Sequence, residues 1–480
     1  MRQRITFLQE PEDSVDPKTL KVTNNDISTK GLKAAREDRI TFSFEELPQE
    51  LYQVLKASHE LHIRWAGQEP YESIVPLVSR VSPGLHVFYT PQRNNNNSTL
   101  LCPMLRKVFG EIDCASPEVW IFSAVIFKSL QKKASFTTLP VERFSHSAAT
   151  QYYTSLPDVD NFVFYLIHKL CTPHKDATCL PRAQLLLGAS TIDIDFDTIS
   201  HALTVTAFWP SQTWDLDIKN TNQDRLEVGI LSVQNPKERE ELSLGGFLTV
   251  VGEDDHPSPT LFSFPARHHP TSQSFTSSFL LPSGLHPTLQ LSISGNKPPV
   301  EERSCSLHAH LTLPCPIFAD KYQLSDPLFL ASKNLSAIHY ISPSVDLEAP
   351  AYTLPFWGSS LLLELAPPSS TFDWTAEIPL HLRYMMPKEG GLQKAEVPSP
   401  VLFWACTAEE GSKFTVNPFE RVNLGYDGLF GPRTMFYHLS PEGVGEGDLV
   451  NVLSVPVLDL SKSAYVEAGT AAVVVAGFAW

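Results

Sequence analysis

Closely spaced aspartates are the first residues of this sequence that could do chemistry. In TIDIDFD, Asp193, Asp195 and Asp197 alternate with apolar residues, so a β-strand would project all three carboxylates from one face. Such a face could hold Ca²⁺, but an EF-hand loop also needs Gly at its sixth position and Glu at its twelfth. Thr198 and Thr204 occupy those places, which excludes that kind of loop.

The Asp-x-Asp pattern of metal-dependent sugar-nucleotide transferases occurs here and again at Asp215 and Asp217 in WDLDIK. Two acids one residue apart are also common on strands whose polar face meets water. We therefore interpret both pairs as solvated strand faces. A metal-dependent glycosyltransferase that uses Asp193 and Asp195, or Asp215 and Asp217, is the alternative.

Histidines between two cysteines form the second candidate. CSLHAHLTLPC places His308 and His310 on one strand face between Cys305 and Cys315. Structural zinc needs four ligands in tetrahedral geometry, and this spacing matches no such site. Exposed histidines beside a disulfide are the preferred interpretation, and zinc is the alternative.

The remaining motifs indicate no catalytic centre. His268 and His269 lie in a proline-flanked segment, where we expect an exposed turn. GVGEGD, from Gly443, lacks the Lys and the strand-to-helix setting of a phosphate loop, and no G-x-S-x-G is present. We assign no catalytic, cofactor-binding or metal-binding residue. An interaction or support protein becomes the leading class, without a cofactor.

Composition narrows the class of protein further. The chain has 480 residues and a formal net charge of -16, without a basic patch that could hold phosphates, so nucleic acid is not an expected partner. Its length allows two or more hydrophobic cores. The 39 prolines favour short strands joined by many turns, because proline disrupts helix interiors and central strands.

Cysteines and glycosylation sequons indicate the secretory pathway. Seven cysteines allow the bridges Cys102–Cys114, Cys171–Cys179 and Cys305–Cys315, with Cys406 left over; the alternative is that all are free and buried. Asn-x-Ser/Thr sequons occur at Asn96, Asn97 and Asn334. The N-terminus does not match an ordinary cleavable signal peptide, because its apolar stretch covers only Ile5 to Leu8.

Periodicity predicts a mainly β fold with a few helices. Amphipathic helices are predicted in PQELYQVLKASHEL, from Pro48, and in PDVDNFVFYLIHKL, from Pro157. Short alternating segments dominate from about Gln184, and those beyond the turn-rich EDDHPSPT favour an antiparallel β-sandwich or barrel. We expect an α+β region over 1–255 and a β-rich domain over 256–465.

The last residues, 468–480, are uncharged and mostly apolar. As a helix they would reach about 20 Å, too short for a bilayer core of about 30 Å. One interpretation is the beginning of a truncated transmembrane helix, and the other is a buried β-strand containing three valines.

Longer segments resemble one known family. Words of the N-terminal half that resemble the fungal protease B non-derepressible protein family are GLKAAREDRITF, ELPQELYQVLKASHELHIRW and SRVSPGLHVFYTP. Words that resemble the phosphatidylinositol-glycan class X domain of that family are LPSGLHP, LPCPIFADKYQL, LEAPAY, IPLHLRYMMP and PSPVLFWAC. The resemblance covers most of the chain, in order, and its specificity comes from the number of matching short sequence segments.

The resemblance implies a single-pass protein of the endoplasmic reticulum membrane with most of its chain in the lumen. It implies a non-catalytic role as partner of the multi-spanning mannosyltransferase that adds the first mannose to glycosylphosphatidylinositol precursors. It also implies support for the folding of other proteins there, and a general luminal chaperone is a second alternative. Two features depart from the family pattern: an insert over 119–134, and a tail that ends inside the expected membrane helix.

Overall fold

The computed structural model describes all residues except 24, 93–99, 117–134, 140–148, 172–178, 221–224, 237, 239, 282, 301–303, 344–346, 348, 370, 371, 415, 416, 444–446 and 480. The predicted insert over 119–134 and the sequons at Asn96 and Asn97 therefore lie outside the described residues.

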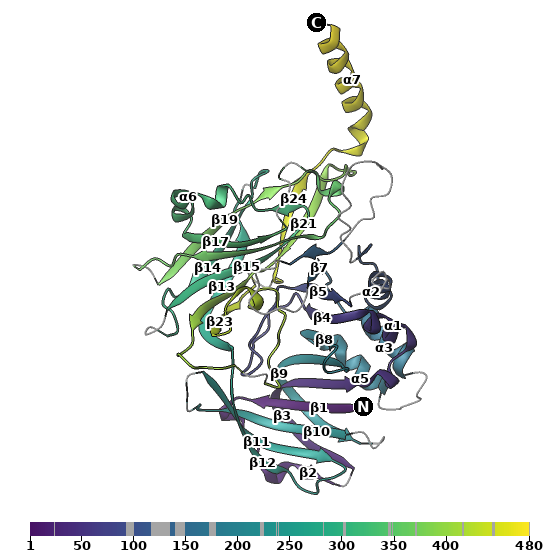
Figure 1. Ribbon diagram of the computed structural model, residues 1–480, viewed down its shortest axis with the longest axis vertical. Helices are drawn as coiled ribbons and strands as arrows, with labels where there is room; N and C mark the ends of the chain where they lie inside the picture. The colour runs from purple at the N-terminus through teal and green to yellow at the C-terminus, as the bar shows by residue number, and fades with distance from the viewer. Residues whose placement is uncertain are drawn as a thin grey trace.

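The described chain is mainly β, as predicted, with most of its helices in the first half, α6 beside the second sheet and α7 at the end (Figure 1). The helices are α1 (Gln49–Ala57), α2 (Leu101–Phe109), α3 (Asp160–Leu166), α5 (Cys179–Leu185), α6 (Pro327–Ser332) and α7 (Ser463–Ala479). The strands of the first half are β1 (Arg2–Gln9), β2 (Lys21–Val22), β3 (Asp26–Phe42), β4 (Ser58–Ala66), β5 (Gly84–Pro91), β6 (Thr137–Thr138), β7 (Thr150–Thr154), β8 (Thr191–Asp197), β9 (Leu203–Lys219), β10 (Arg225–Gln234), β11 (Glu241–Val251) and β12 (Ser258–Pro265). Those of the second half are β13 (His268–Phe279), β14 (Thr288–Ser294), β15 (Cys305–Pro314), β16 (Ile317–Phe318), β17 (Leu335–Ser342), β18 (Gly358–Leu365), β19 (Asp373–Pro379), β20 (His381–Leu382), β21 (Leu392–Pro398), β22 (Val401–Thr407), β23 (Thr434–Pro441) and β24 (Val450–Pro456).

A 12-stranded sheet forms the first half, in the order β12-β11-β10-β1-β3-β9-β8-β4-β5-β7-β6, with β2 beside β3. It extends past the predicted division after residue 255, to the end of β12. The helices α1, α2 and α3 bury apolar side chains against the β4, β5 and β8 region, and these residues form the largest core of this half. Such burial contributes about 25 cal/mol per Å² of apolar surface.

An 8-stranded sheet forms the second half, in the order β17-β18-β15-β22-β23-β13-β14-β19. Alternate residues of nearly all its strands enter one core, which β16, β21 and α6 also cover. The edges of this sheet meet near α6, because the Glu377 amide donates to the Lys333 carbonyl and the Asn334 side chain donates to the Thr375 carbonyl. The sheet therefore curls around its core.

Both large sheets are mixed, which corrects the prediction of a purely antiparallel second half. Strand β13 runs parallel to β23, and β1 runs parallel to β10. The predicted turn at His268 and His269 is also wrong, because these residues begin β13 and both are buried. Their partner strand β23 comes from far along the chain, so local turn signals could not reveal it.

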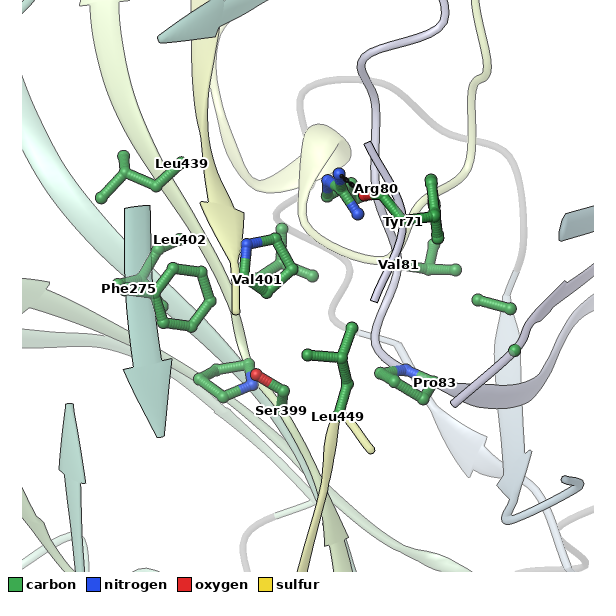
Figure 2. Close-up of a pocket in the computed structure, with 14 residues that line it drawn as sticks. Tyr71, Arg80, Val81, Pro83, Phe275, Ser399, Val401, Leu402, Leu439 and Leu449 are labelled. Atoms are coloured by element: carbon green, nitrogen blue, oxygen red, sulfur yellow. Dashed lines mark hydrogen bonds between the residues drawn. The ribbon is translucent and has the colours of Figure 1, made fainter. Parts of the chain in front are cut away.

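The two halves pack directly against each other. Trp357, from the second half, joins the core under α1 and α2, and its indole donates to the Gln151 carbonyl at 3.0 Å. The Tyr426 hydroxyl donates to the Arg80 carbonyl at 2.9 Å. Figure 2 shows the junction beside Arg80, where Tyr71 and Pro83 face Phe275 and Leu402 across a small cavity. The segment before β5 thus separates the two sheets.

The tail is a helix, α7, whose described residues are exposed except for the half-buried Ser463 at its start. The alternative of a buried β-strand over 468–480 is therefore wrong, and the helix begins earlier than predicted, at Ser463. Figure 1 shows α7 projecting away from the body of the molecule, beyond β21 and β24. No helix among the described residues combines the length and the apolar character needed to cross a bilayer.

Candidate functional site

The aspartates of β8 share one face, but that face is not solvated as predicted. Asp193 is buried, and the segment between β22 and β23 covers it. The Arg421 guanidinium, from that segment, lies 2.6 Å from Asp193 Oδ2 in an ion pair, and Arg64 Nε lies 3.5 Å from Asp193 Oδ1. Arg64 also donates to the Val422 carbonyl at 2.8 Å. The carboxylate of the first half is therefore held between arginines from both halves.

Asp195 belongs to the same network. It accepts hydrogen bonds from Arg64 and from His62 Nδ1. Burial opposes its ionisation, but Arg64 and His62 outweigh burial and hold the pKa of the Asp195 carboxyl well below its usual range. Asp197 instead accepts from the backbone amides of Ile199 and Ser200 and closes the turn after β8.

The second acidic pair lies elsewhere. Asp215 accepts from the Gly31 amide, and Asp217 pairs with Lys219 at 3.1 Å; both aspartates are exposed on β9. A metal-dependent transferase needs carboxylates that are available to the metal and lie near its substrate. Because the buried pair is occupied by arginines and the exposed pair is remote from it, the geometry gives the glycosyltransferase alternative no support.

Arg64 is the member of this network that sequence reasoning missed. It interrupts the apolar run HIRWA, and an arginine is almost never fully buried without a partner. A charged residue inside an apolar strand segment could therefore have indicated a buried ion pair. Arg421 gave no such signal, because it does not interrupt an apolar run and its partner lies in the other half of the chain.

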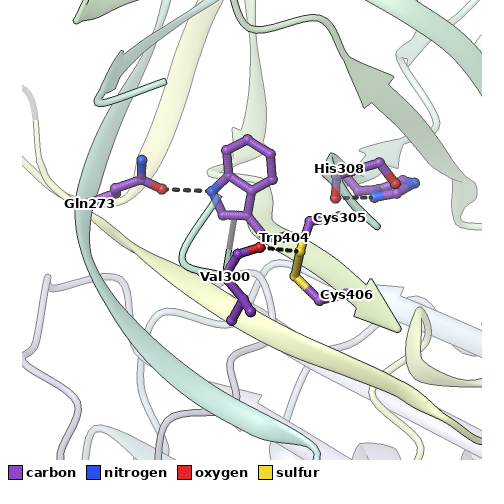
Figure 3. The surroundings of a disulfide bond; sticks show 7 residues. Gln273, Val300, Cys305, His308, Trp404 and Cys406 are labelled. Atoms are coloured by element: carbon purple, nitrogen blue, oxygen red, sulfur yellow. Dashed lines mark hydrogen bonds between the residues drawn. A yellow bond between two sulfur atoms is a disulfide. The ribbon is translucent and has the colours of Figure 1, made fainter. Parts of the chain in front are cut away.

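The structure joins Cys102 to Cys114 and Cys171 to Cys179. The third bridge differs from the expected one: Cys305 is bonded to Cys406, and Cys315 is a free thiol. Cys305 and Cys315 flank the whole of β15, which at about 3.3 Å per residue separates them far beyond disulfide reach. Cys406 lies directly opposite Cys305 on β22, as Figure 3 shows beside Trp404.

Asn334 lies in the turn between α6 and β17, with a φ of 55°. Its side-chain amide donates to the Thr375 carbonyl at 2.8 Å, and the residue is half-buried. Asparagine tolerates this left-handed conformation better than most residues. An attached glycan would leave one N–H on this nitrogen, which could still donate to the Thr375 carbonyl. The geometry is therefore compatible with a glycan, and glycosylation at Asn334 stays a prediction.

The histidines of β15 are buried, not exposed as predicted, because the segment between β22 and β23 also covers this face. His310 contacts Tyr426, with the ring centroids 5.5 Å apart and the ring planes tilted by 54°. His308 lies between the rings of Phe403 and Phe430. Neither histidine approaches the free thiol of Cys315 as a ligand group, so the four-residue zinc alternative has no support.

Exposed apolar side chains surround the base of α7. The segments that carry them are joined, because the Lys388 amide donates to the Leu458 carbonyl at 3.1 Å and β21 pairs with β24. We call these residues the helix-base surface: Tyr384, Met386, Leu392, Leu458, Leu460 and Tyr465. Tyr384 is 72% exposed and Met386 is 56% exposed. This surface is the best candidate for a contact with another molecule.

Two tyrosines from segments that resemble the family do not pack in the core. Tyr384, in HLRYMMP, and Tyr322, in FADKYQL, could each have packed inside the β-rich domain. Instead both side chains are mostly exposed, and Tyr322 lies next to Gln323, which hydrogen-bonds His381. Neither tyrosine ring is needed to fill the core.

The family model that matches this chain covers most of the second half and begins after β13. A family model described as PIG-X / PBN1 matches residues 282–480. Protein pbn1 of Neurospora crassa is 49% identical over 100% of this chain and 94% of its own length. Protein PBN1 of Gibberella zeae is 43% identical over the same shares of both chains. Protein PBN1 of Saccharomyces cerevisiae is 31% identical over 47% of this chain and 51% of its own.

Among solved structures, the collagen-binding domain of the Erysipelothrix rhusiopathiae surface protein RspB is 11% identical. That match covers 55% of this chain and 72% of that domain. Its TM-score is 0.14, which carries no argument about the fold.

Proposed function

The chain belongs to the PIG-X / PBN1 family, and from this premise we propose that it is a non-catalytic subunit of the mannosyltransferase that adds the first mannose to glycosylphosphatidylinositol precursors. It acts at the membrane of the endoplasmic reticulum, with the two sheets in the lumen. The same role extends to the folding of some other proteins of that compartment. The multi-spanning catalytic subunit is the partner.

The observation that carries this proposal is the helix-base surface together with α7. The apolar side chains of α7 have no cover from the rest of the described chain; Phe478, for example, is 91% exposed. Exposed apolar area of this kind is costly in water and is typical of a membrane or protein contact. Since the helix-base surface leads directly into α7, one partner at the bilayer can cover both.

A stabilising subunit needs no active site. A partner that binds only the folded enzyme shifts its folding equilibrium by RT ln(1 + [L]/Kd), about 2.7 kcal/mol at a hundredfold excess over Kd. Confinement of both proteins to one membrane raises their effective concentration. The folded transferase then persists at a higher level.

Substitutions in the helix-base surface test the proposal. We expect Tyr384→Asp with Met386→Asp to lower recovery of the transferase with the tagged full chain roughly tenfold, which corresponds to about 1.4 kcal/mol of binding free energy. Both side chains are exposed, so the fold should be unaffected. The measurement is quantitative mass spectrometry of affinity-purified microsomal protein, with first-mannose transfer as a second readout.

Ile199→Asp is the matched control, because Ile199 is 92% exposed at the opposite half of the molecule. It should leave recovery of the transferase unchanged. Equal recovery from both variants and from the natural chain would contradict the proposal. Recovery of many client proteins without a stoichiometric transferase would instead support the general luminal chaperone.

A further inference from the structure

Three side chains with metal-binding atoms meet on neighbouring strands at the edge of the second sheet. His308 on β15 lies opposite Glu364 on β18, and β18 also pairs with the edge strand β17, which carries His339. One nitrogen or oxygen atom from each side chain lies within 4.8 Å of the other two. In the part of the chain that the structure describes, no other group of three His, Cys, Asp or Glu is gathered this closely.

The strand pattern places these residues on one face. The neighbours of His308 and Glu364 along their strands enter the core, so both side chains project from the opposite face. The pairing of β17 with β18 shifts between Ile338 and Tyr340, which makes His339 the extra residue of a β-bulge. A bulge redirects a side chain relative to the regular pleat. Here His339 reaches Glu364.

His308 is already in the form that binds a metal. Its Nδ1 donates to the Ser306 carbonyl at 3.1 Å, visible in Figure 3, so Nε2 carries the lone pair. A carbonyl partner on the second ring nitrogen is usual for metal-binding histidines, because it fixes the tautomer and the ring orientation.

His339 and Glu364 complete the set. His339 Nε2 lies 2.6 Å from Glu364 Oε2, so the imidazole N–H donates to the carboxylate, and a metal ion would take the place of that proton. Both side chains are partly exposed and can adjust by rotation. Among the ion pairs of the described residues, Glu364 has no arginine or lysine that would compete with a cation. Phe403 and Phe430 form the apolar wall behind His308.

We propose that His308, His339 and Glu364 bind one Zn²⁺ ion. Two imidazoles and one carboxylate are a common zinc ligand set, with a fourth position left to water. The ion joins the edge strand β17 to β18 and β15, because each strand supplies one ligand. It would stabilise the attachment of the edge strand β17 to the rest of the sheet.

Zinc binding to the full chain tests this site. The protein, without a polyhistidine tag, is freed of metal and titrated with Zn²⁺ against a chromophoric chelator. We expect one equivalent to bind, and we expect His339→Gln and Glu364→Gln each to weaken binding at least about tenfold. Both positions are partly exposed, so these variants should fold; the buried His308 is left unchanged.

His256→Gln is the control, because His256 forms an exposed pair with Asp255 and belongs to no group of three. It should keep the natural zinc affinity and the natural rise in melting temperature with added Zn²⁺, and the two ligand variants should lose that rise. Tetrahedral Co²⁺ absorption should follow the same order. Less than one equivalent of zinc, or equal affinity in all four proteins, would overturn the proposal.

Discussion

Asp193 lies between two guanidinium groups, one on β4 of the first half and one on the segment that follows β22 in the second half. Each arginine also donates to backbone carbonyls, Arg64 to those of Ile63 and Val422 and Arg421 to that of Ser79. A buried ion pair adds little net stability when intact, but removing one partner leaves an uncompensated charge. At the scale of residues, these aspartates thus serve the joint between the halves.

We predict that Asp193→Asn destabilises the protein by about 3–5 kcal/mol, since the buried Arg64 and Arg421 lose an anionic partner. Asp217→Asn should cost less than about 1 kcal/mol, because the Asp217–Lys219 pair is exposed. Urea unfolding of the two purified variants measures both values. Similar losses in the two variants would show that the network does not join the halves.

At the scale of elements, the disulfide between β15 and β22 links strands that are far apart in the sequence. Cys305 and Cys406 are separated by 101 positions yet lie opposite each other in the ladder. A bridge over a loop of that length restricts the unfolded chain by about 4.7 kcal/mol in the entropic account. This bridge therefore stabilises the centre of the second sheet.

Replacing both Cys305 and Cys406 by Ala should lower stability by about 2–5 kcal/mol. Cys315→Ala is the matched control and should change stability little, because Cys315 forms no disulfide. Melting temperature of the purified proteins, with peptide mapping under non-reducing conditions, checks both the stability and the pairing. A Cys305–Cys315 peptide would contradict the described ladder.

At the scale of the whole molecule, buried histidines make the fold sensitive to acid. Burial lowers the pKa of His86 to about 4 and that of His438 to about 3, and it also lowers the pKa of His268, which shares a 2.8 Å hydrogen bond with His438. These rings are neutral when folded and gain a proton more readily when unfolded. Their contribution to the free energy of unfolding is therefore complete above about pH 6.5 and is lost as the pH falls below that value.

We expect stability to fall by roughly 2 kcal/mol at pH 5 for each histidine held at a pKa of 4 or below. Glu420 acts in the opposite sense, because burial raises its pKa to about 7 and favours the fold at low pH, and burial also raises the pKa of Asp193 and of Glu10. The buried histidines with a lowered pKa outnumber these three acids. Urea midpoints between pH 7.5 and pH 4.5 at constant ionic strength measure the balance. Urea midpoints that do not change with pH would show that the histidines do not control the pH dependence of stability.

Local patterns predicted much of the secondary structure. The strands that contain TIDIDFD, SLHAHLTL and SSLLLELA form as expected, because alternation of apolar and polar residues is a property of neighbours along the chain. The helix predicted from Pro48 forms but ends at Ala57, and SHEL joins β4 instead. There the pairing of β4 with β5 and β8 outweighs the local helical pattern.

The sites were predicted less well, for a physical reason. The pattern showed that Asp193 and His308 each project from one face of a strand, but not what covers that face. In both cases the cover is the segment between β22 and β23, which supplies Arg421 and Phe430. Burial under this segment makes Asp193 a partner in an ion pair instead of a solvated acid. It makes His308 a buried residue packed against aromatic rings instead of an exposed one.

The sequence by itself determined the β-rich class, the family and the apolar character of the tail, because these depend on composition and on short ordered words. Only the tertiary structure decided that Cys305 pairs with Cys406 and that His339 lies beside His308 and Glu364. It also decided that Asp193 and Asp195 form ion pairs with arginines. Each of those pairings joins residues on different strands, and strand order is set by how the whole chain buries its apolar faces.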